Sequence, residues 1–166
     1  PCQAKMESTV IQGVIVRPAL ETDAASVAKI LRALGWFDHL EAEAVGETES
    51  RIRRHIGWCR ADDSHSLYVA EKAQGDVIGY ASVHWLPYLF LPGPEGYLSE
   101  LFVDETHRGK GIGKRLLEAI VKEARHRGCS RLMLVTSRGR ESYKREFYSK
   151  EGWVEREDVA NFVLKF

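Results

Sequence analysis

The sequence predicts a mixed α/β fold of the α+β kind, in which helices flank a twisted, mostly antiparallel sheet. Strand-like and helix-like segments alternate, two strand-like runs are joined by a tight turn, and a glycine-rich turn leads from one strand into an amphipathic helix. A strand that follows such a helix in the same sheet pairs in parallel with the strand before it. We therefore expect one parallel pair in the sheet.

The N-terminal third is predicted to contain one strand and two helices. Residues 14–17 read as a short strand, and residues 21–34 carry apolar side chains at helical spacing. Gly35 ends that helix, because glycine is favoured just beyond a helix C-terminus. Residues 51–60 form a weaker helix candidate.

A hairpin and a long loop follow. Residues 67–73 and 77–85 are strand-like and are joined by the turn Gln74-Gly75-Asp76. The segment 86–96 contains three prolines and two glycines among apolar side chains. We interpret it as a surface loop that could form a substrate wall.

The second half continues with a strand at 98–103, the glycine-rich turn and a helix that Gly128 ends. The helix has Ile112, Leu116, Ile120 and Ala124 at four-residue intervals. The remaining predicted elements are a strand at 131–136, a helix at 141–150 stopped by Gly152, and a final hairpin at 153–166.

Composition predicts one cytoplasmic domain covering 1–166, with a core of about 14–166. Residues 1–13 are expected to be flexible or of vector origin. The 24 basic and 24 acidic residues cancel, which argues against nucleic acid or an anionic membrane as partner. No apolar run approaches the roughly 20 residues that span a bilayer. Three dispersed cysteines fit a reducing compartment and predict neither a disulfide framework nor a metal site.

The clearest functional signal is the turn His107-Arg108-Gly109-Lys110-Gly111-Ile112-Gly113-Lys114-Arg115. Its alternate glycines would allow backbone amides to approach an anion closely. Basic residues in the first turn of a helix are electrostatically unfavourable unless an anion binds there. The spacing excludes a Walker loop and a dinucleotide fingerprint, and a solvated turn with scattered basic residues is the alternative.

These residues resemble the acetyl-CoA motif of the GCN5-related N-acetyltransferase (GNAT) family, in which Arg108, Gly111 and Gly113 match in register. The resemblance extends from Val16-Arg17-Pro18-Ala19 through Glu100-Leu101-Phe102-Val103 to Phe147-Tyr148-Ser149-Lys150-Glu151-Gly152-Trp153. Lys144 and Trp153 depart from the residues common in the family. The resemblance implies a GNAT-type fold and acetyl-CoA as the acyl donor, without a metal.

The resemblance also implies where the donor binds. Its pantetheine arm would pair with the strand formed by Leu101, Phe102 and Val103, with the N–H of Val103 facing the thioester oxygen. The predicted phosphate-binding residues are those of the turn: Arg108, Gly109, Lys110, Gly111, Ile112, Gly113 and Lys114.

Two residues are candidates for proton transfer. Tyr148 matches the family tyrosine that acts as general acid near the sulfur, although it could simply be an interfacial aromatic residue. Glu100 is predicted to share a strand face with Leu98 and Phe102, where apolar surroundings would raise its pKa toward that of a base. Glu100 could instead form a salt bridge or act through water. His84 is the reserve candidate.

Four aromatic residues could line the acceptor pocket or close the core under the loop: Trp85, Tyr88, Phe90 and Tyr97.

The predicted reaction is direct transfer of acetyl from acetyl-CoA to a primary amine of a small molecule or a protein. The alternative is a non-catalytic acyl-CoA sensor or regulatory module. A homodimer is possible by resemblance, because dimers are common in the family.

Overall fold

The computed structural model describes residues 13–166, so the expectation for residues 1–13 falls almost wholly outside the described residues. Two compact units divide the chain, one ending at Leu134 and one running from Val135 to Phe166. A single domain over the whole chain therefore stays a prediction. None of the helices in the described part of the chain is long and apolar enough to cross a membrane.

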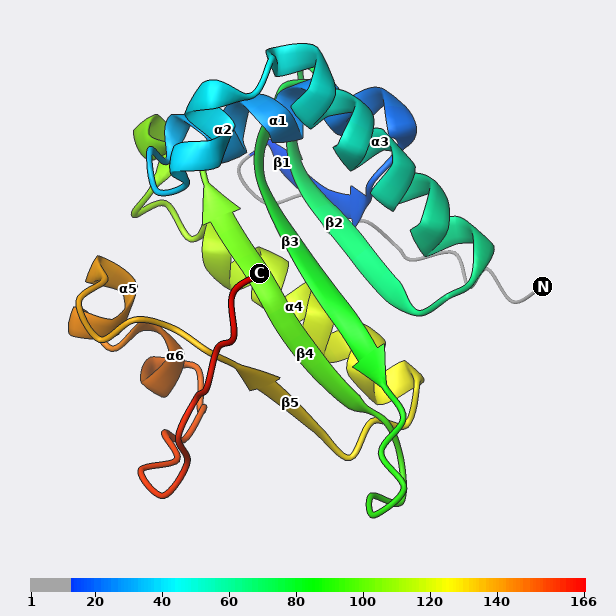
Figure 1. Cartoon of the computed structure of the whole chain (residues 1–166), viewed down its shortest axis with the longest axis vertical. Coiled ribbons are helices and arrows are strands. Elements are labelled where there is room, and N and C mark those ends of the chain that lie inside the picture. The colour runs from blue at the N-terminus through cyan, green and yellow to red at the C-terminus, as the bar shows by residue number, and fades with distance from the viewer. Residues whose placement is uncertain (1–12) are drawn as a thin grey trace. The chain divides into compact units, whose positions relative to one another are not determined.

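The first unit is built on a five-stranded sheet with the order β1-β2-β3-β4-β5 (Figure 1). Neighbouring strands are antiparallel except β4 and β5, which are parallel. The fold class, the hairpin and the single parallel pair are thus confirmed. The strands are β1 (Val14–Pro18), β2 (His65–Lys72), β3 (Val77–Leu86), β4 (Glu95–Val103) and β5 (Arg131–Leu134).

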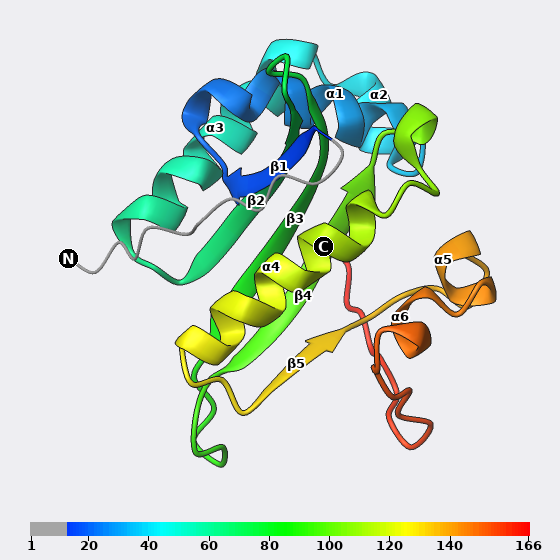
Figure 2. The ribbon, with the colours of Figure 1, turned by 180° about the vertical axis from the view of Figure 1, so that it is seen from behind.

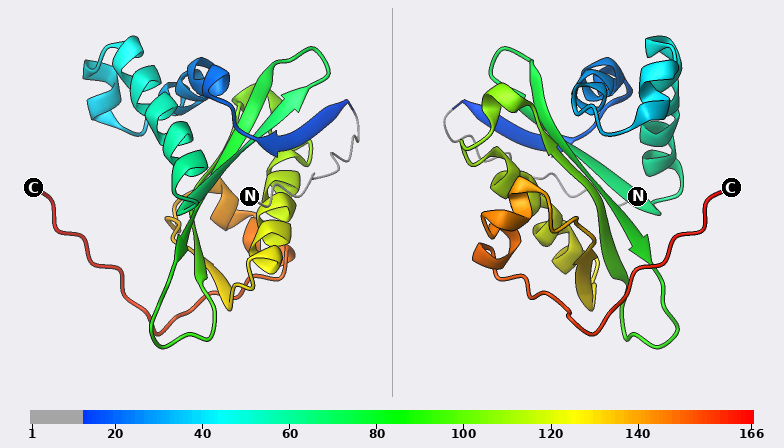
Figure 3. Two further views of the ribbon diagram at one scale, coloured as in Figure 1. Left: turned by 90° about the vertical axis from the view of Figure 1, so that its right-hand side faces the viewer. Right: turned by 60° about the vertical axis from the view of Figure 1, so that its left-hand side comes forward.

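Helices cover both faces of this sheet, which lies between α1 and α3 on one side and α4 on the other (Figure 3). The helical elements of the first unit are η1 (Glu21–Asp23), α1 (Ala24–Ala33), α2 (Asp38–Ala42), α3 (Val45–Ala61), η2 (Glu105–His107) and α4 (Ile112–His126).

Helix α3 begins at Val45 rather than at Arg51 as predicted, and the short α2 was not predicted. The early start has a local cause, because the side chain of Glu47 accepts a hydrogen bond from the backbone N–H of Ala44 at 3.2 Å. Thr48, fully buried in the first turn, bonds to Glu43 at 2.9 Å. Because these bonds are made by polar side chains, the spacing of apolar residues does not reveal where the helix begins.

The face covered by α1 and α3 contains the main apolar cluster, in which Val27, Ile56 and Val69 are almost inaccessible to solvent. At its edge, Arg17 of β1 binds Asp23 through two bonds of 2.7 and 2.9 Å and Glu71 through one of 2.7 Å. This arginine therefore ties β1 to η1 and β2.

On the opposite face α4 packs along the sheet (Figure 2). Its buried residues are Ile112, Leu116, Leu117, Ile120 and Ala124. The predicted four-residue stripe is thus the buried face of this helix. Because α4 starts one residue after Gly111, its packing fixes the position of the glycine-rich turn.

The second unit contains two short helices, α5 (Glu141–Lys144) and α6 (Phe147–Lys150), instead of the single helix predicted at 141–150. Glu146, between them, has φ of +57°, which interrupts α-helical geometry. The predicted hairpin at 153–166 is wrong, since the structure has no strand in these residues. Apolar side chains such as Phe162 are exposed there, and a strand needs a backbone partner that sequence pattern alone does not supply.

Replacing Gly96 by alanine is expected to reduce the free energy of unfolding by about 1–3 kcal/mol. An added Cβ would lie 2.4 Å from Cδ2 of Leu132 and 2.8 Å from the ring of Trp85. Chemical denaturation would measure the change. Gly46→Ala is the control, because its Cβ would meet nothing within 4 Å; an equal loss in both variants would contradict the close packing at Gly96.

Candidate active site

An irregularity in β4 determines which side chains face the α1 and α3 side of the sheet. Ser82 pairs with Glu100, whereas the next residue, Val83, pairs with Leu98, so Ser99 is an extra residue in β4. Such a bulge reverses the alternation of side chains. Glu100 therefore shares a face with Phe102, as expected, but Leu98 lies on the opposite face, which corrects the prediction.

Beyond the bulge, the edge of β4 toward β5 is open. The β4–β5 ladder covers Glu95–Leu98 opposite Arg131–Leu134, and in the described residues no strand continues it along β4. The N–H of Asp104 donates to the carbonyl of Ile78 in β3 at 2.9 Å. Because successive N–H groups alternate in direction, that of Val103 points away from β3, toward the open edge.

The glycine-rich turn lies at the end of this edge. Gly109 and Gly111 have φ of +74° and +77°, which are left-handed values that glycine adopts without strain. A Cβ at either position would meet nothing within 4 Å, so the space beside both residues is open. Gly111 is the N-cap of α4, and the first backbone N–H groups of a helix lack partners within the helix.

Positive charge surrounds these amides. The first turn of α4 contains no acidic residue, and Arg108 and Lys110 precede it as exposed side chains. Nε of Arg108 donates to the carbonyl of Val103 at 3.1 Å, and Nζ of Lys110 donates to the carbonyl of Thr106 at 3.0 Å. Arg108 thus joins the turn to the open edge of β4, where a pyrophosphate would be stabilised by amides and cations together.

A pocket of about 150 Å³ lies between this sheet face and the helices α1 and α3. Glu100 lines it, together with the reserve candidate His84. The other lining residues are Val27, Leu31, Arg51, Ile52, His55, Cys59, His65, Leu67, Tyr80 and Ser82.

Glu100 is partly buried in this pocket, and burial raises the pKa of its carboxyl group. The buried hydroxyl of Tyr80 interacts with it and opposes this shift, but forms no hydrogen bond of standard geometry with any described residue. Burial and the nearby carboxylate raise the pKa of Tyr80. Glu100 therefore lacks a cationic partner among its described hydrogen bonds and ion pairs, and it holds a proton more strongly than an exposed glutamate.

Three histidines form the adjoining part of the wall. The rings of His65 and His84 are stacked with centroids 5.5 Å apart, and the ring of His55 lies 6.2 Å from that of His65. Burial, followed by the charge of neighbouring histidines, lowers the pKa of His84, and the pKa of His55 is lowered by burial, His65 and Arg51. At neutral pH both rings are therefore largely uncharged.

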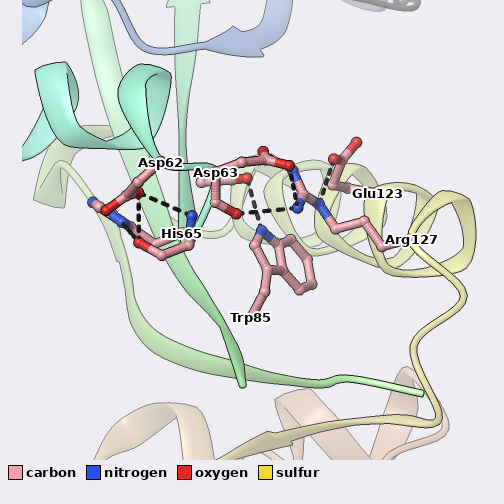
Figure 4. A network of polar contacts seen from close by, with 8 residues as sticks. Asp62, Asp63, His65, Trp85, Glu123 and Arg127 are labelled. Atoms are coloured by element: carbon pink, nitrogen blue, oxygen red, sulfur yellow. Dashed lines mark hydrogen bonds and ion pairs between the residues drawn. The ribbon is translucent and has the colours of Figure 1, made fainter. Parts of the chain in front are cut away.

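The buried His65 is held by bonds on both ring nitrogens. Its Nδ1 lies 2.9 Å from Oγ of Ser64, which donates to Asp62 at 2.7 Å, and its Nε2 lies 3.2 Å from the carbonyl oxygen of His55. Figure 4 shows this side chain at one end of a polar network that continues toward α4. These bonds hold the side chain of His65, at the start of β2, in place in the pocket wall.

Trp85 lies along that network between His65 and Arg127, on the α4 face of the sheet (Figure 4). Its Nε1 donates to Oγ of Ser66 at 3.0 Å, and the guanidinium of Arg127 lies 4.7 Å from its ring centroid. Arg127 is in turn bound to Asp63 at 2.6 Å and to Glu123 at 2.7 Å. Trp85 is therefore not brought together with Glu100, and its contacts serve the core.

The three other aromatic residues that were predicted to line the acceptor pocket lie in two different places. Tyr97 pairs with His84 across β3 and β4 and is half-buried on the pocket side of the sheet. Tyr88 and Phe90 lie on the exposed loop after β3, with ring centroids 5.2 Å apart. None of these aromatic residues is among the residues that line the Glu100 pocket.

Tyr148 belongs to α6 in the second unit. Its ring contacts Phe147 and Trp153, with centroids 5.0 and 6.1 Å away. Burial raises the pKa of the hydroxyl, although Arg140 and Arg145 oppose the shift. The group therefore stays protonated at neutral pH and can donate a proton.

Sequence reasoning missed most of the pocket wall. His55 and Arg51 lie on α3 and His65 starts β2, so residues from separate elements meet only in the folded sheet. No spacing in the sequence joins them. The alternation of β3 gave a partial signal, because Tyr80, Ser82 and His84 share one face.

Comparison with known proteins identifies the family. The model of the acetyltransferase (GNAT) family matches residues 31–153. A thialysine N-ε-acetyltransferase of Bos taurus is 28% identical over 155 residues, covering 84% of this chain and 89% of that protein. An L-methionine sulfoximine/L-methionine sulfone acetyltransferase of Pseudomonas aeruginosa is 34% identical over 85 residues, covering 49% of this chain and 48% of its own.

The fold agrees as well. The crystal structure of glucosamine-6-phosphate N-acetyltransferase from Arabidopsis thaliana superposes with a TM-score of 0.72 at 22% identity, covering 92% of this chain and 99% of that one. At this identity the likeness shows the fold alone. The chain belongs to the acetyltransferase (GNAT) family and is an acetyltransferase.

Replacing Glu100 by glutamine is expected to stabilise the protein at neutral pH. Because burial raises the pKa of Glu100, the folded state favours the protonated form, and wild-type stability falls as pH rises above the ordinary carboxyl range. The advantage of the variant should vanish in acid, where the carboxyl is protonated in both states. Denaturant unfolding across this pH range would measure it.

Asp104→Asn is the matched control of opposite sign. Hydrogen bonds from Thr106 and His107 lower the pKa of Asp104, so its removal should destabilise the protein at neutral pH and matter less in acid. The assignment of Glu100 as a buried, proton-retaining carboxyl is contradicted if both variants change stability in the same direction with pH.

Proposed function

We propose that this acetyltransferase transfers the acetyl group of acetyl-CoA to a primary amine by direct attack in a ternary complex. The observation that carries the proposal is the construction of β4. Its open edge ends at the glycine-rich turn, and the bulge within it directs Glu100 into a pocket. The bovine relative is an N-acetyltransferase, which supports an amine acceptor.

The residues of the turn fit the pyrophosphate of acetyl-CoA. The open space beside Gly109 and Gly111 admits phosphate oxygens to the amides at the start of α4, namely those of Ile112, Gly113 and Lys114. Arg108, Lys110 and Lys114 supply positive charge. The amides lack acidic neighbours in the first turn, which would otherwise repel the ligand.

The open edge fits the pantetheine arm. Residues Leu101–Val103 present backbone groups that β5 does not cover, and a chain containing amides could pair with them as a strand would. The N–H of Val103 points toward this edge and is our candidate for stabilising negative charge on the thioester oxygen. When bound, acetyl-CoA supplies the activated acetyl group.

Glu100 is proposed as the group that accepts a proton from the acceptor ammonium, directly or through a water molecule. An amine attacks only when its lone pair is free, and a carboxyl with a raised pKa is a better base than an exposed one. His84 lines the same pocket as a largely neutral imidazole that could take the same role.

Tyr148 is proposed as the proton donor to the departing sulfur. Its protonated hydroxyl suits this role at neutral pH. The family signature around Phe147 and Tyr148 supports the assignment.

For the compartment, we propose the cytoplasm, since Cys59 and Cys129 are both free thiols.

Tyr148→Phe is expected to lower kcat by about 10²-fold or more while changing the KM for acetyl-CoA little, because general acid catalysis contributes roughly 10²–10⁴-fold. Release of free CoA thiol across a panel of amines would measure both constants. Tyr143→Phe is the control in the same unit, since the Tyr143 hydroxyl donates to Glu155 at 2.8 Å. Unchanged turnover in Tyr148→Phe would remove its role as acid, and CoA binding without release from any amine would favour a sensor.

Lys110→Glu is expected to weaken CoA binding by about tenfold or more, since it places a negative charge beside the pyrophosphate site. Isothermal titration calorimetry at low and high salt should show that the loss shrinks as salt screens the charges. Lys122→Glu is the matched control, because Lys122 is also exposed but lies in the C-terminal half of α4, away from the turn. Equal losses in the two variants would argue against a phosphate site at the turn.

A further inference from the structure

The pocket beside Glu100 has an uneven distribution of charge. Among the described residues that line it, Glu100 is the one acid, whereas Arg51, His55, His65 and His84 are basic side chains. Arg51 is ion-paired with Glu43, with a second bond of 2.9 Å, so this pair adds little net charge. Besides Glu100, the imidazoles of the three histidines are therefore the side chains that determine which ligand groups the pocket binds.

Two of these imidazoles have unused hydrogen-bonding capacity. Both ring nitrogens of His65 are bonded, and Nε2 of His84 lies 3.1 Å from Oγ of Ser99. Nδ1 of His84 and both ring nitrogens of His55 form no hydrogen bond with another described residue. His55 is exposed on α3 and lines the pocket, which places it at the mouth.

The surroundings of His55 favour an anion. Burial lowers the pKa of its ring most, and the neighbouring charges of His65, Arg51 and Arg54 lower it further. A carboxylate bound there would accept a hydrogen bond from the N–H of the His55 imidazole. A second ammonium group of a polyamine would find no carboxylate there, because Glu100 is the one acid among the described residues that line the pocket.

We propose that the acceptor is a compact amino acid or similar aminocarboxylate, bound with its amine toward Glu100 and its carboxylate toward His55. This inference rests on the proposed acetyl transfer. The pocket volume of about 150 Å³ is below the roughly 300–1,000 Å³ of pockets that enclose drug-sized ligands, which favours a compact acceptor. Polycationic amines are disfavoured because the pocket offers a single carboxylate.

Matched acceptors test the proposal. γ-Aminobutyrate, butylamine and putrescine share one carbon skeleton and differ in the second end group, and leucine and isopentylamine form an α-amino pair. Thiol release from acetyl-CoA should give a kcat/KM about tenfold higher for an aminocarboxylate than for its alkylamine, with putrescine lowest in its series. If butylamine or putrescine is a better substrate than γ-aminobutyrate, and isopentylamine is a better one than leucine, the proposal is overturned while acetyl transfer to amines stands. No transfer to any amine would instead contradict the proposed function itself.

The variant His55→Leu gives the second readout. It should lower kcat/KM several-fold for the preferred aminocarboxylate and change that of the corresponding alkylamine much less, because leucine has no hydrogen-bond donor and only the former acceptor carries the group that His55 binds. A general structural defect would reduce both. His126→Leu, at an exposed histidine on α4, is the control and should change neither. Equal losses for the two acceptors in His55→Leu would overturn the placement of the carboxylate at His55.

Discussion

Ser99 is inserted into β4 opposite the bond between Ser82 and Val83, and this extra residue reverses the direction of the side chains on either side of it. Tyr97 and Glu100 both face α1 and α3 as a result, while Leu98 turns toward α4. The β4–β5 ladder ends at Leu98, immediately before the inserted residue. One local change in register thus places a carboxylate in a pocket and coincides with the end of the ladder along the adjacent edge.

The two sides of the candidate site are electrostatically distinct. At the start of α4, backbone amides and exposed cations form a region suited to a strongly charged pyrophosphate that remains partly in water. In the pocket, burial raises the pKa of Glu100 and lowers that of His84, so both groups are moved toward neutrality. Charged donor phosphates and the reacting amine would therefore occupy different environments, linked by β4.

Local signals in the sequence were sufficient for much of the first unit. Alternation identified the β2–β3 hairpin, the four-residue stripe identified α4, and the alternate glycines identified the turn before it, because each pattern lies within one short segment. The bulge at Ser99 carries no local signature, so the face of Leu98 was predicted wrongly. The pocket wall was missed because His55, His65 and His84 come from three elements that meet only in the folded chain. The hairpin predicted at 153–166 failed for a related reason, since apolar alternation cannot supply a neighbouring strand.

A crystal structure of the full chain with CoA and an aminocarboxylate would show where the donor and the acceptor bind. We expect the pyrophosphate at the amides that begin α4, the pantetheine arm paired with Leu101–Val103, and the amine of the acceptor in the pocket beside Glu100. CoA bound away from the open edge of β4, or an acceptor whose amine lies outside that pocket, would overturn the proposed site.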